Sequence, residues 1–140
     1  MSGILEVTIE QTGSTSSKAT ARTHTVVVDR SLAKGGTDQG PVGGEYMLIG
    51  LGGCFTSHLL GAIRAREADV SGVKVTVSGT LDGSPERFTD LHVTVSAAGD
   101  PALIEKLTTI AERSCQVMNT LRGTVPITLQ VEGAPAVSVK

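Results

Sequence analysis

The chain has 140 residues and a formal net charge of −2, with 39% hydrophobic and 19% charged residues. This length and hydrophobic content suffice for one domain with its own core, so we expect a single domain over residues 1–140. Aromatic residues make up only 2%, and the 12 Lys and Arg residues form no basic stripe. Both observations argue against nucleic-acid binding, which needs exposed aromatic side chains or a positive patch.

The compartment is predicted from the cysteines and from the apolar segments. Two cysteines are too few for the disulfide framework of a small secreted protein. Residues 1–6 show no basic segment followed by an apolar one, so no signal peptide is predicted. The apolar run 46–63 approaches the length of a membrane span, but it contains glycines, hydroxyl side chains and His58. We therefore expect a cytoplasmic protein, without a membrane span, in which this run is a buried helix.

The N-terminal third predicts two strands and a loop. Apolar and polar residues alternate over residues 4–10, which is typical of a strand. A second strand is expected over residues 21–29, after a turn rich in Thr, Ser and Gly at residues 11–17. Residues 31–44 contain many glycines and predict a long irregular loop, a feature that is often functional in compact domains.

A long helix is predicted over about residues 44–68. It is apolar on every side up to Ile63, a pattern that indicates burial on all faces. Gly50, Gly52 and Gly53 each lower its helix propensity by roughly 1 kcal/mol, which is easier to explain if another element packs tightly there. A helix covered on all faces is difficult to bury in 140 residues, and an intertwined dimer would cover it.

The second half begins with a predicted hairpin. Residues 73–77 and 91–95 alternate apolar and polar side chains, and residues 82–85 carry the turn signal between them. A second helix is expected after Asp100, with Pro101 at its first position.

A short third helix is predicted from a Ser114 cap through Leu121, and Gly123 ends it. A last strand follows over residues 127–131. The element order is β-β-α-β-β-α-α-β, an α+β fold with antiparallel hairpins around one long buried central helix. The inner face of the second helix is expected to consist of Leu103, Leu107 and Ile110.

Two cysteines in different settings suggest a redox pair. Cys54 lies in the apolar helix and Cys115 lies near the start of the third helix. In such a pair a thiolate attacks a peroxide and becomes a sulfenic acid, which condenses with the second thiol. The alternative for Cys54 is a buried structural cysteine. His58 follows Cys54 by four positions on the same helix face, so it could act as a base or donate a hydrogen bond there.

A reactive thiolate also needs a nearby cation. Arg30, after the second strand, is the candidate, and Arg22 is its competitor. Glu45 lies about 900° and about 13 Å before Cys54 on a regular helix. It can therefore approach the thiol only if the helix is irregular or if two subunits share the site. Glu45 could orient Arg30 through a bidentate pair, or it could simply be a first-turn carboxylate that the helix dipole favours.

Metal and nucleotide sites are weaker alternatives. Cys54, His58 and Cys115 with a carboxylate could hold zinc, but no CxxC pair or known finger spacing is present. The glycines of residues 50–53 lie within a helix, and no P-loop motif occurs, so no nucleotide cofactor is expected.

Further evidence comes from four segments in sequence order: Gly35–Pro41, Glu45–Leu48, Leu51–Cys54 and Cys115–Leu121. Together they resemble the OsmC/Ohr superfamily of osmotically inducible protein C and organic hydroperoxide resistance proteins, and the element order matches over nearly the whole chain. Two positions depart from that pattern. A Gly43-Gly44 pair precedes Glu45 where proline is usual, and Gln116 replaces a common proline after the second cysteine.

The resemblance implies a swapped homodimer with two active sites at its interface and a thiol-dependent peroxidase for small organic hydroperoxides, without metal or haem. Cys54 would be the attacking thiol, Cys115 the resolving thiol, and Glu45 the partner of an arginine, for which Arg30 stands in the right region. It also implies regeneration by a dithiol reductant such as a lipoylated protein. The alternative is a non-catalytic module that binds a small hydrophobic ligand at the dimer interface.

Overall fold

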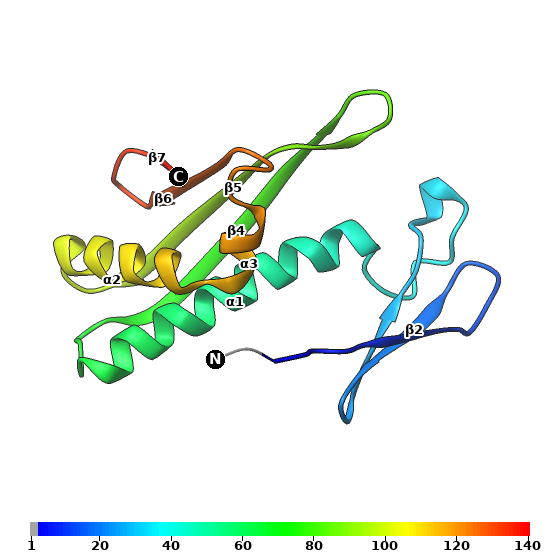
Figure 1. Cartoon of the computed structure of the whole chain (residues 1–140), viewed down its shortest axis with the longest axis horizontal. Helices are drawn as coiled ribbons and strands as arrows, with labels where there is room; N and C mark the ends of the chain where they lie inside the picture. Colours follow the sequence, from blue (N-terminus) through cyan, green and yellow to red (C-terminus); the bar gives the residue numbers. More distant parts are fainter. Residues whose placement is uncertain (1–2) are drawn as a thin grey trace. The chain divides into compact units, whose positions relative to one another are not determined.

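Residues 3–140 are described by the structure, a computed structural model with an α+β arrangement of two sheets and several helices (Figure 1). The chain divides into two compact units, Met1–Met47 and Leu48–Lys140. Helix α1 (Gly43–Ala65) begins in the first unit and continues in the second. The single domain expected over residues 1–140 remains a prediction.

The first unit is a three-stranded antiparallel sheet in the order β1-β2-β3. Strand β1 spans Thr8–Gln11, β2 spans Ser17–Ala21 and β3 spans His24–Val28. The loop after β3 contains a short 3-10 helix, η1, at Leu32–Lys34.

The apolar residues of this sheet are not buried. Ile9, Ala19 and Val26 form one row across the three strands, and Ile9 and Val26 are 57% and 45% exposed. Within residues 3–47 the only buried residues are polar, namely Ser16 and Asp29. The first unit therefore has no hydrophobic core of its own.

The structure has a strand that was not predicted. The strand predicted over residues 21–29 covers β3 but only Ala21 of β2, because the polar sequence of β2 shows no alternation of apolar and polar residues. Arg22 in the turn between β2 and β3 has a φ of 58°. Glycine and asparagine usually occupy such left-handed positions, so no turn signal marks Arg22 in the sequence.

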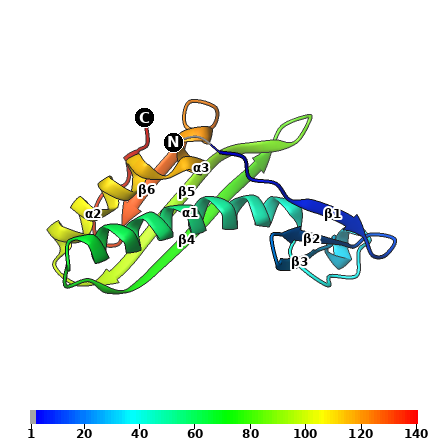
Figure 2. The same cartoon turned by 60° about the horizontal axis from the view of Figure 1, so that its bottom comes forward.

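The second unit is built on a sheet in the order β4-β5-β6-β7. Strands β4 (Ser71–Asp82) and β5 (Arg87–Ala98) form the predicted antiparallel hairpin. Strand β6 (Ile127–Val131) pairs with β5 in parallel, and β7 (Val137–Ser138) pairs with β6 antiparallel. Helices α1 and α2 lie along one face of this sheet (Figures 1 and 2).

The parallel pairing of β5 with β6 was not predicted. Two helices separate β5 from β6, and a crossover of this length returns the chain to the end of the sheet at which β5 begins. Strand β7 lies in the C-terminal segment, for which no strand was predicted.

Helix α1 is buried along one face instead of on every face. Leu51, Phe55 and Leu59 are almost fully buried, whereas Ile49 and Leu60 are 56% and 50% exposed. The predicted burial on all sides is therefore not present within one chain. By length and composition α1 also meets the criterion for a membrane span, with a mean hydropathy of 1.4, a criterion that core helices of globular proteins also meet.

Another element was expected to pack tightly against Gly50, Gly52 and Gly53 of α1, and this is confirmed at Gly52 alone. A Cβ atom at Gly52 would lie 2.8 Å from the Val77 Cγ2 atom of β4, so only glycine allows this approach. No atom lies within 4 Å of a Cβ built at Gly50 or Gly53. The Gly52 contact sets how closely α1, and with it Cys54, lies against the sheet.

Helix α2 spans Pro101–Ser114 and α3 spans Gln116–Leu121. The predicted cap is confirmed, because Asp100 Oδ2 accepts a hydrogen bond of 3.1 Å from the Leu103 amide. The predicted inner face was rotated by about one residue, because Leu103 and Ile110 are only half-buried. The buried residues of α2 are Ile104, Leu107, Thr108 and Ala111.

Candidate thiol site

Cys115 forms the junction between α2 and α3. Its amide donates to the Ala111 carbonyl at 3.0 Å and closes α2, and its Sγ accepts the Met118 amide at 3.4 Å and caps α3. Ser114 was predicted to be this cap. Its hydroxyl instead donates to the Ile110 carbonyl at 3.0 Å, which keeps Ser114 in the last turn of α2.

The thiol of Cys115 is fully buried, with 0% exposed surface. Burial raises its pKa to about 11, because the charged thiolate loses its hydration there. The neighbouring Cys54 thiol raises the pKa further, whereas the amides of Met118 and Val117 oppose the shift. Cys115 is therefore a protonated thiol at neutral pH, and it lies close enough to Cys54 for the two groups to influence each other.

Cys54 is only partly buried, and it shares a hydrogen-bonding partner with His58. Its Sγ donates to Gln116 Oε1 at 3.3 Å. The Nε2 atom of His58 lies 2.8 Å from the same oxygen and donates to it in the Nε2-protonated tautomer. The four-residue spacing correctly placed Cys54 and His58 on one helix face. The contribution of Gln116 was missed, because no local spacing relates α1 to α3.

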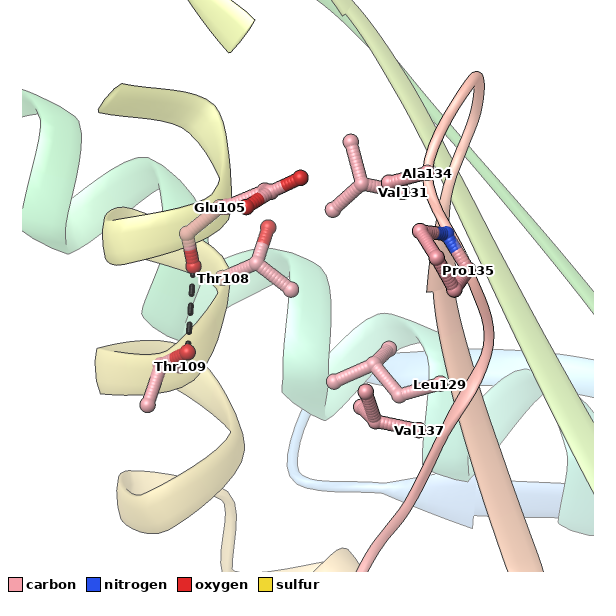
Figure 3. A pocket seen from close by; sticks show the side chains of 8 residues that line it. All are labelled: Glu105, Thr108, Thr109, Leu129, Val131, Ala134, Pro135 and Val137. Atoms are coloured by element: carbon pink, nitrogen blue, oxygen red, sulfur yellow. Dashed lines mark hydrogen bonds between the residues drawn. The ribbon is translucent and has the colours of Figure 1, made fainter. Parts of the chain in front are cut away.

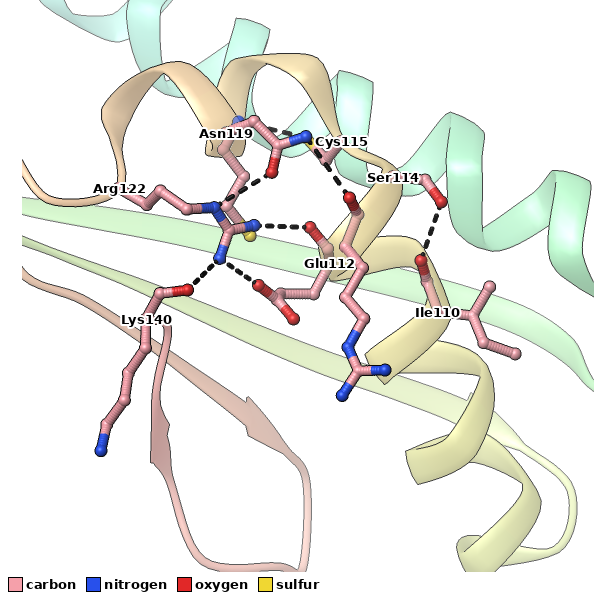
Figure 4. A network of polar contacts seen from close by, with 9 residues as sticks. Ile110, Glu112, Ser114, Cys115, Asn119, Arg122 and Lys140 are labelled. Atoms are coloured by element: carbon pink, nitrogen blue, oxygen red, sulfur yellow. Dashed lines mark hydrogen bonds and ion pairs between the residues drawn. The ribbon is translucent and has the colours of Figure 1, made fainter.

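A partly buried network holds the α2–α3 junction in place (Figure 4). The Arg122 Nη1 atom lies 2.6 Å from Glu112 Oε1 and donates to the Lys140 carbonyl, also at 2.6 Å. Its Nη2 donates to the Glu112 carbonyl at 3.0 Å, and its Nε donates to Asn119 Oδ1 at 3.0 Å. One guanidinium thus links α2, the end of α3 and the C-terminal segment, which restrains Cys115 between them.

In the first unit, the carboxylate of Asp29 fixes the loop that begins at Arg30. It accepts hydrogen bonds from the hydroxyls of Thr37 at 2.5 Å and Thr15 at 2.8 Å, and from the amides of Arg30 at 2.6 Å and Gln39 at 3.2 Å. The Thr37 bond is the main cause that holds the pKa of Asp29 well below its usual range, against the effect of its burial.

Gly36 allows the same loop to close. A Cβ atom at Gly36 would lie 2.1 Å from the Arg30 carbonyl oxygen, a distance that no side chain can accommodate. The backbone of Arg30 is therefore fixed on both sides, while its side chain is exposed. The glycine-rich loop that sequence analysis singled out has a structural role in positioning this arginine.

Glu45 lies in the first turn of α1, where its Oε1 accepts the Val42 amide at 2.9 Å. This contact matches the first-turn carboxylate that sequence analysis gave as the alternative. The other alternative, a pair between Glu45 and Arg30, is not formed within residues 3–140, where the one ion pair is Arg122–Glu112. The competitor Arg22 lies exposed in the β2–β3 turn.

The structure thus brings Cys54 and Cys115 together within the second unit, with His58 and Gln116 beside Cys54. Arg30 and Glu45 belong to the first unit, and their catalytic roles stay predictions. For the zinc alternative, the described part of the chain contains no group of three or more His, Cys, Asp or Glu side chains that could hold a metal ion.

The family model of OsmC-like proteins matches residues 36–130. Because this match covers well over half of the sequence, the chain belongs to the OsmC-like family. No curated protein matches it in sequence.

Solved structures of OsmC-like proteins share the fold. An OsmC-like protein from Mycoplasma pneumoniae is 18% identical with a TM-score of 0.77, covering 94% of this chain and 97% of its own. An organic hydroperoxide resistance protein from Legionella pneumophila is 19% identical with a TM-score of 0.69, covering 92% and 96%. Another, from Elizabethkingia anophelis with thiocyanate bound, is 17% identical with a TM-score of 0.73, covering 94% and 96%.

The raised pKa of Cys115 predicts a stability change at high pH. An unfolded thiol ionises near pH 8.5, whereas the folded one ionises at about 11. Folding holds the proton more tightly, so this contribution to stability is complete below about pH 8.5 and is lost as pH rises towards 11. Urea unfolding of the reduced protein at several pH values should show a steeper loss between pH 9 and 11 than the same series on Cys115→Ser. Equal losses of unfolding free energy in the two proteins would contradict a raised pKa for Cys115.

Proposed function

We propose that the chain is a thiol-dependent peroxidase that reduces organic hydroperoxides to alcohols in defence against oxidative or osmotic stress. The observation that carries this proposal is the asymmetry of the two thiols. Cys54 is partly exposed and can meet a peroxide, whereas Cys115 is fully buried beside it. Membership of the OsmC-like family and a fold shared with organic hydroperoxide resistance proteins support the same chemistry.

The reaction has two steps in the oxidative direction. The Cys54 thiolate attacks the peroxide oxygen that bears the proton, the O–O bond breaks, and the alcohol leaves after its alkoxide oxygen takes up a proton. The product at Cys54 is a sulfenic acid. The sulfur of Cys115 then attacks the sulfur of Cys54, a disulfide forms, and the sulfenic oxygen leaves as water with the thiol proton of Cys115.

The environment of Cys115 suits the resolving role. Its raised pKa keeps it protonated at neutral pH, so it does not compete with Cys54 for the peroxide. Part of that raised pKa comes from Cys54 itself. When Cys54 becomes a sulfenic acid, the thiolate charge at that position disappears, and deprotonation of Cys115 becomes easier at the step that needs it.

Gln116 and His58 would serve the first step. The single oxygen Gln116 Oε1 contacts both the Cys54 Sγ and the His58 Nε2 atoms, so it places the imidazole beside the sulfur. The bond to Cys54 exists only while the thiol is protonated, whereas the bond to His58 remains once the thiolate has formed. We propose that His58 supplies the proton that the departing alkoxide requires. Gln116 would act as a positioning residue that holds both groups.

In this proposal Arg30 is the cation that stabilises the thiolate in a homodimer, and Glu45 is the carboxylate that orients the arginine. The Asp29 hydrogen bonds fix the backbone of Arg30 and leave its side chain exposed. The exposed apolar residues Ile9, Val26 and Ile49 support a second copy of the chain as the partner that covers them. In the cytoplasm, a dithiol reductant, for which a lipoylated protein is one candidate, would convert the disulfide back to two thiols by exchange.

The redox pair predicts a defined change in mass. After treatment of the reduced protein with a slight excess of cumene hydroperoxide, intact-mass and thiol analysis should show loss of two hydrogens and of both thiols. Cys54→Ser should abolish hydroperoxide consumption. Cys115→Ser should keep the first step and accumulate a sulfenic acid that dimedone traps. Two unreacted thiols in the native protein would contradict the peroxidase and favour the non-catalytic module that binds a small hydrophobic ligand.

The shared amide predicts that Gln116 and His58 act as one unit. Gln116→Leu should slow the first step about tenfold, because His58 loses the acceptor that holds its imidazole beside Cys54, a hydrogen bond worth about 1.4 kcal/mol. The double variant with His58→Leu should lose little more than Gln116→Leu alone, because both changes remove one network. Thr120→Val is the matched control on α3, where its hydroxyl donates only to the Gln116 carbonyl. Additive losses in the single-turnover rate would contradict the shared role.

The homodimer predicts a molecular mass near twice that of the 14.4 kDa chain in sedimentation equilibrium. Ile9→Asp and Ile49→Asp, each at an exposed apolar position, should shift the equilibrium toward the monomer, because a buried carboxylate without a partner is strongly unfavourable. Lys74→Asp on the polar side of β4 is the control. A wild-type protein that stays monomeric at high concentration would disprove this part of the proposal.

A further inference from the structure

A cavity of about 220 Å³ lies between α2 and the β6–β7 hairpin of the second unit (Figure 3). None of the thiol-site residues lines it. One side is an apolar wall from the hairpin, and the other side is the polar surface of α2. The wall consists of Leu129, Val131, Ala134, Pro135 and Val137.

The hydroxyl of Thr108 points from α2 into this cavity without a partner. Thr108 is 3% exposed, and its Oγ1 is the one buried side-chain oxygen or nitrogen in residues 3–140 that makes no hydrogen bond. The adjacent Thr109 shows the usual alternative, because its hydroxyl donates to the Glu105 carbonyl at 3.1 Å. Figure 3 shows the Thr108 oxygen on the same side of the cavity as the Glu105 carboxylate instead. A buried polar group without a partner is unfavourable, so a ligand that supplies one would bind here.

Size and charge define the ligand class. A cavity of about 150 Å³ holds benzene, so 220 Å³ admits a single ring with a short substituent. Glu105 is the one charged side chain among the lining residues, and it lies one helical turn before Thr108. A carboxylate next to a hydroxyl favours a cationic group that donates hydrogen bonds and disfavours an anion.

We propose that this cavity is a binding site for a small amphipathic ammonium compound. Its ring contacts the apolar wall, and its ammonium group donates to Thr108 Oγ1 and to the Glu105 carboxylate. The site is independent of the thiol chemistry, because its ligand reaches neither cysteine.

Calorimetric titration of the full chain with three matched probes tests the ligand class. Benzylamine should bind at least about tenfold more tightly than benzyl alcohol, and benzoate should not bind, because only the amine carries the positive charge. Glu105→Gln should weaken benzylamine binding about tenfold, whereas Glu86→Gln in the exposed β4–β5 turn should leave it unchanged. Absence of saturable benzylamine binding, or equal binding of the amine and the alcohol, would overturn the proposal.

Thr108→Val separates a binding role from a structural one. Valine has nearly the shape of threonine without the hydroxyl, so the variant should melt at a higher temperature, because the unpaired buried hydroxyl is gone. The same variant should bind benzylamine several-fold more weakly. Thr120→Val on α3 should change neither value. Unchanged affinity for benzylamine in Thr108→Val would show that the hydroxyl serves no ligand and would overturn the assignment.

Discussion

The break between α2 and α3 at Cys115 is the constraint on which the thiol site depends. One residue closes α2 through its amide and caps α3 through its sulfur, so the backbone of Cys115 is held at both helix ends. The Arg122 network holds the same junction from the other side. Because α3 starts there, Gln116 is directed at Cys54, and the buried thiol and the partly exposed one face a common space.

Regular elements with strong local signals were predictable from the sequence. The Asp100-Pro101 start of α2 and the β4–β5 hairpin follow from capping and turn chemistry, which act within a few residues. The β2–β3 turn was not predictable, because Arg22 adopts a conformation that its own side chain disfavours. Thr108 was left out of the predicted inner face of α2 because the prediction counted only apolar residues as buried. In the structure its hydroxyl is buried without a partner, and Thr108 lines the cavity beside α2.

Some residues of the candidate thiol site could also be predicted from the sequence, and others could not. The two cysteines and the Cys54–His58 spacing could be recognised in the sequence, because a helix relates positions four apart in a fixed way. Gln116 could not, because its contact depends on how α1 and α3 pack in three dimensions. Ser114 was predicted as the cap of α3, but Cys115 is the cap. A serine hydroxyl can either cap a following helix or donate to a carbonyl of its own helix, and the residue type alone does not tell which bond forms.

The first unit has an apolar sheet surface that is exposed within one chain. Its three strands present Ile9 and Val26 to solvent, and its two buried residues are polar. A small sheet needs a covered apolar face for stability, and the described chain leaves this face open. Arg30 and Glu45 lie in this same unit, with the arginine backbone fixed and its side chain free. A partner that covers the sheet would therefore stabilise the unit that carries both predicted charged residues, so assembly and thiol activation would depend on the same apolar surface.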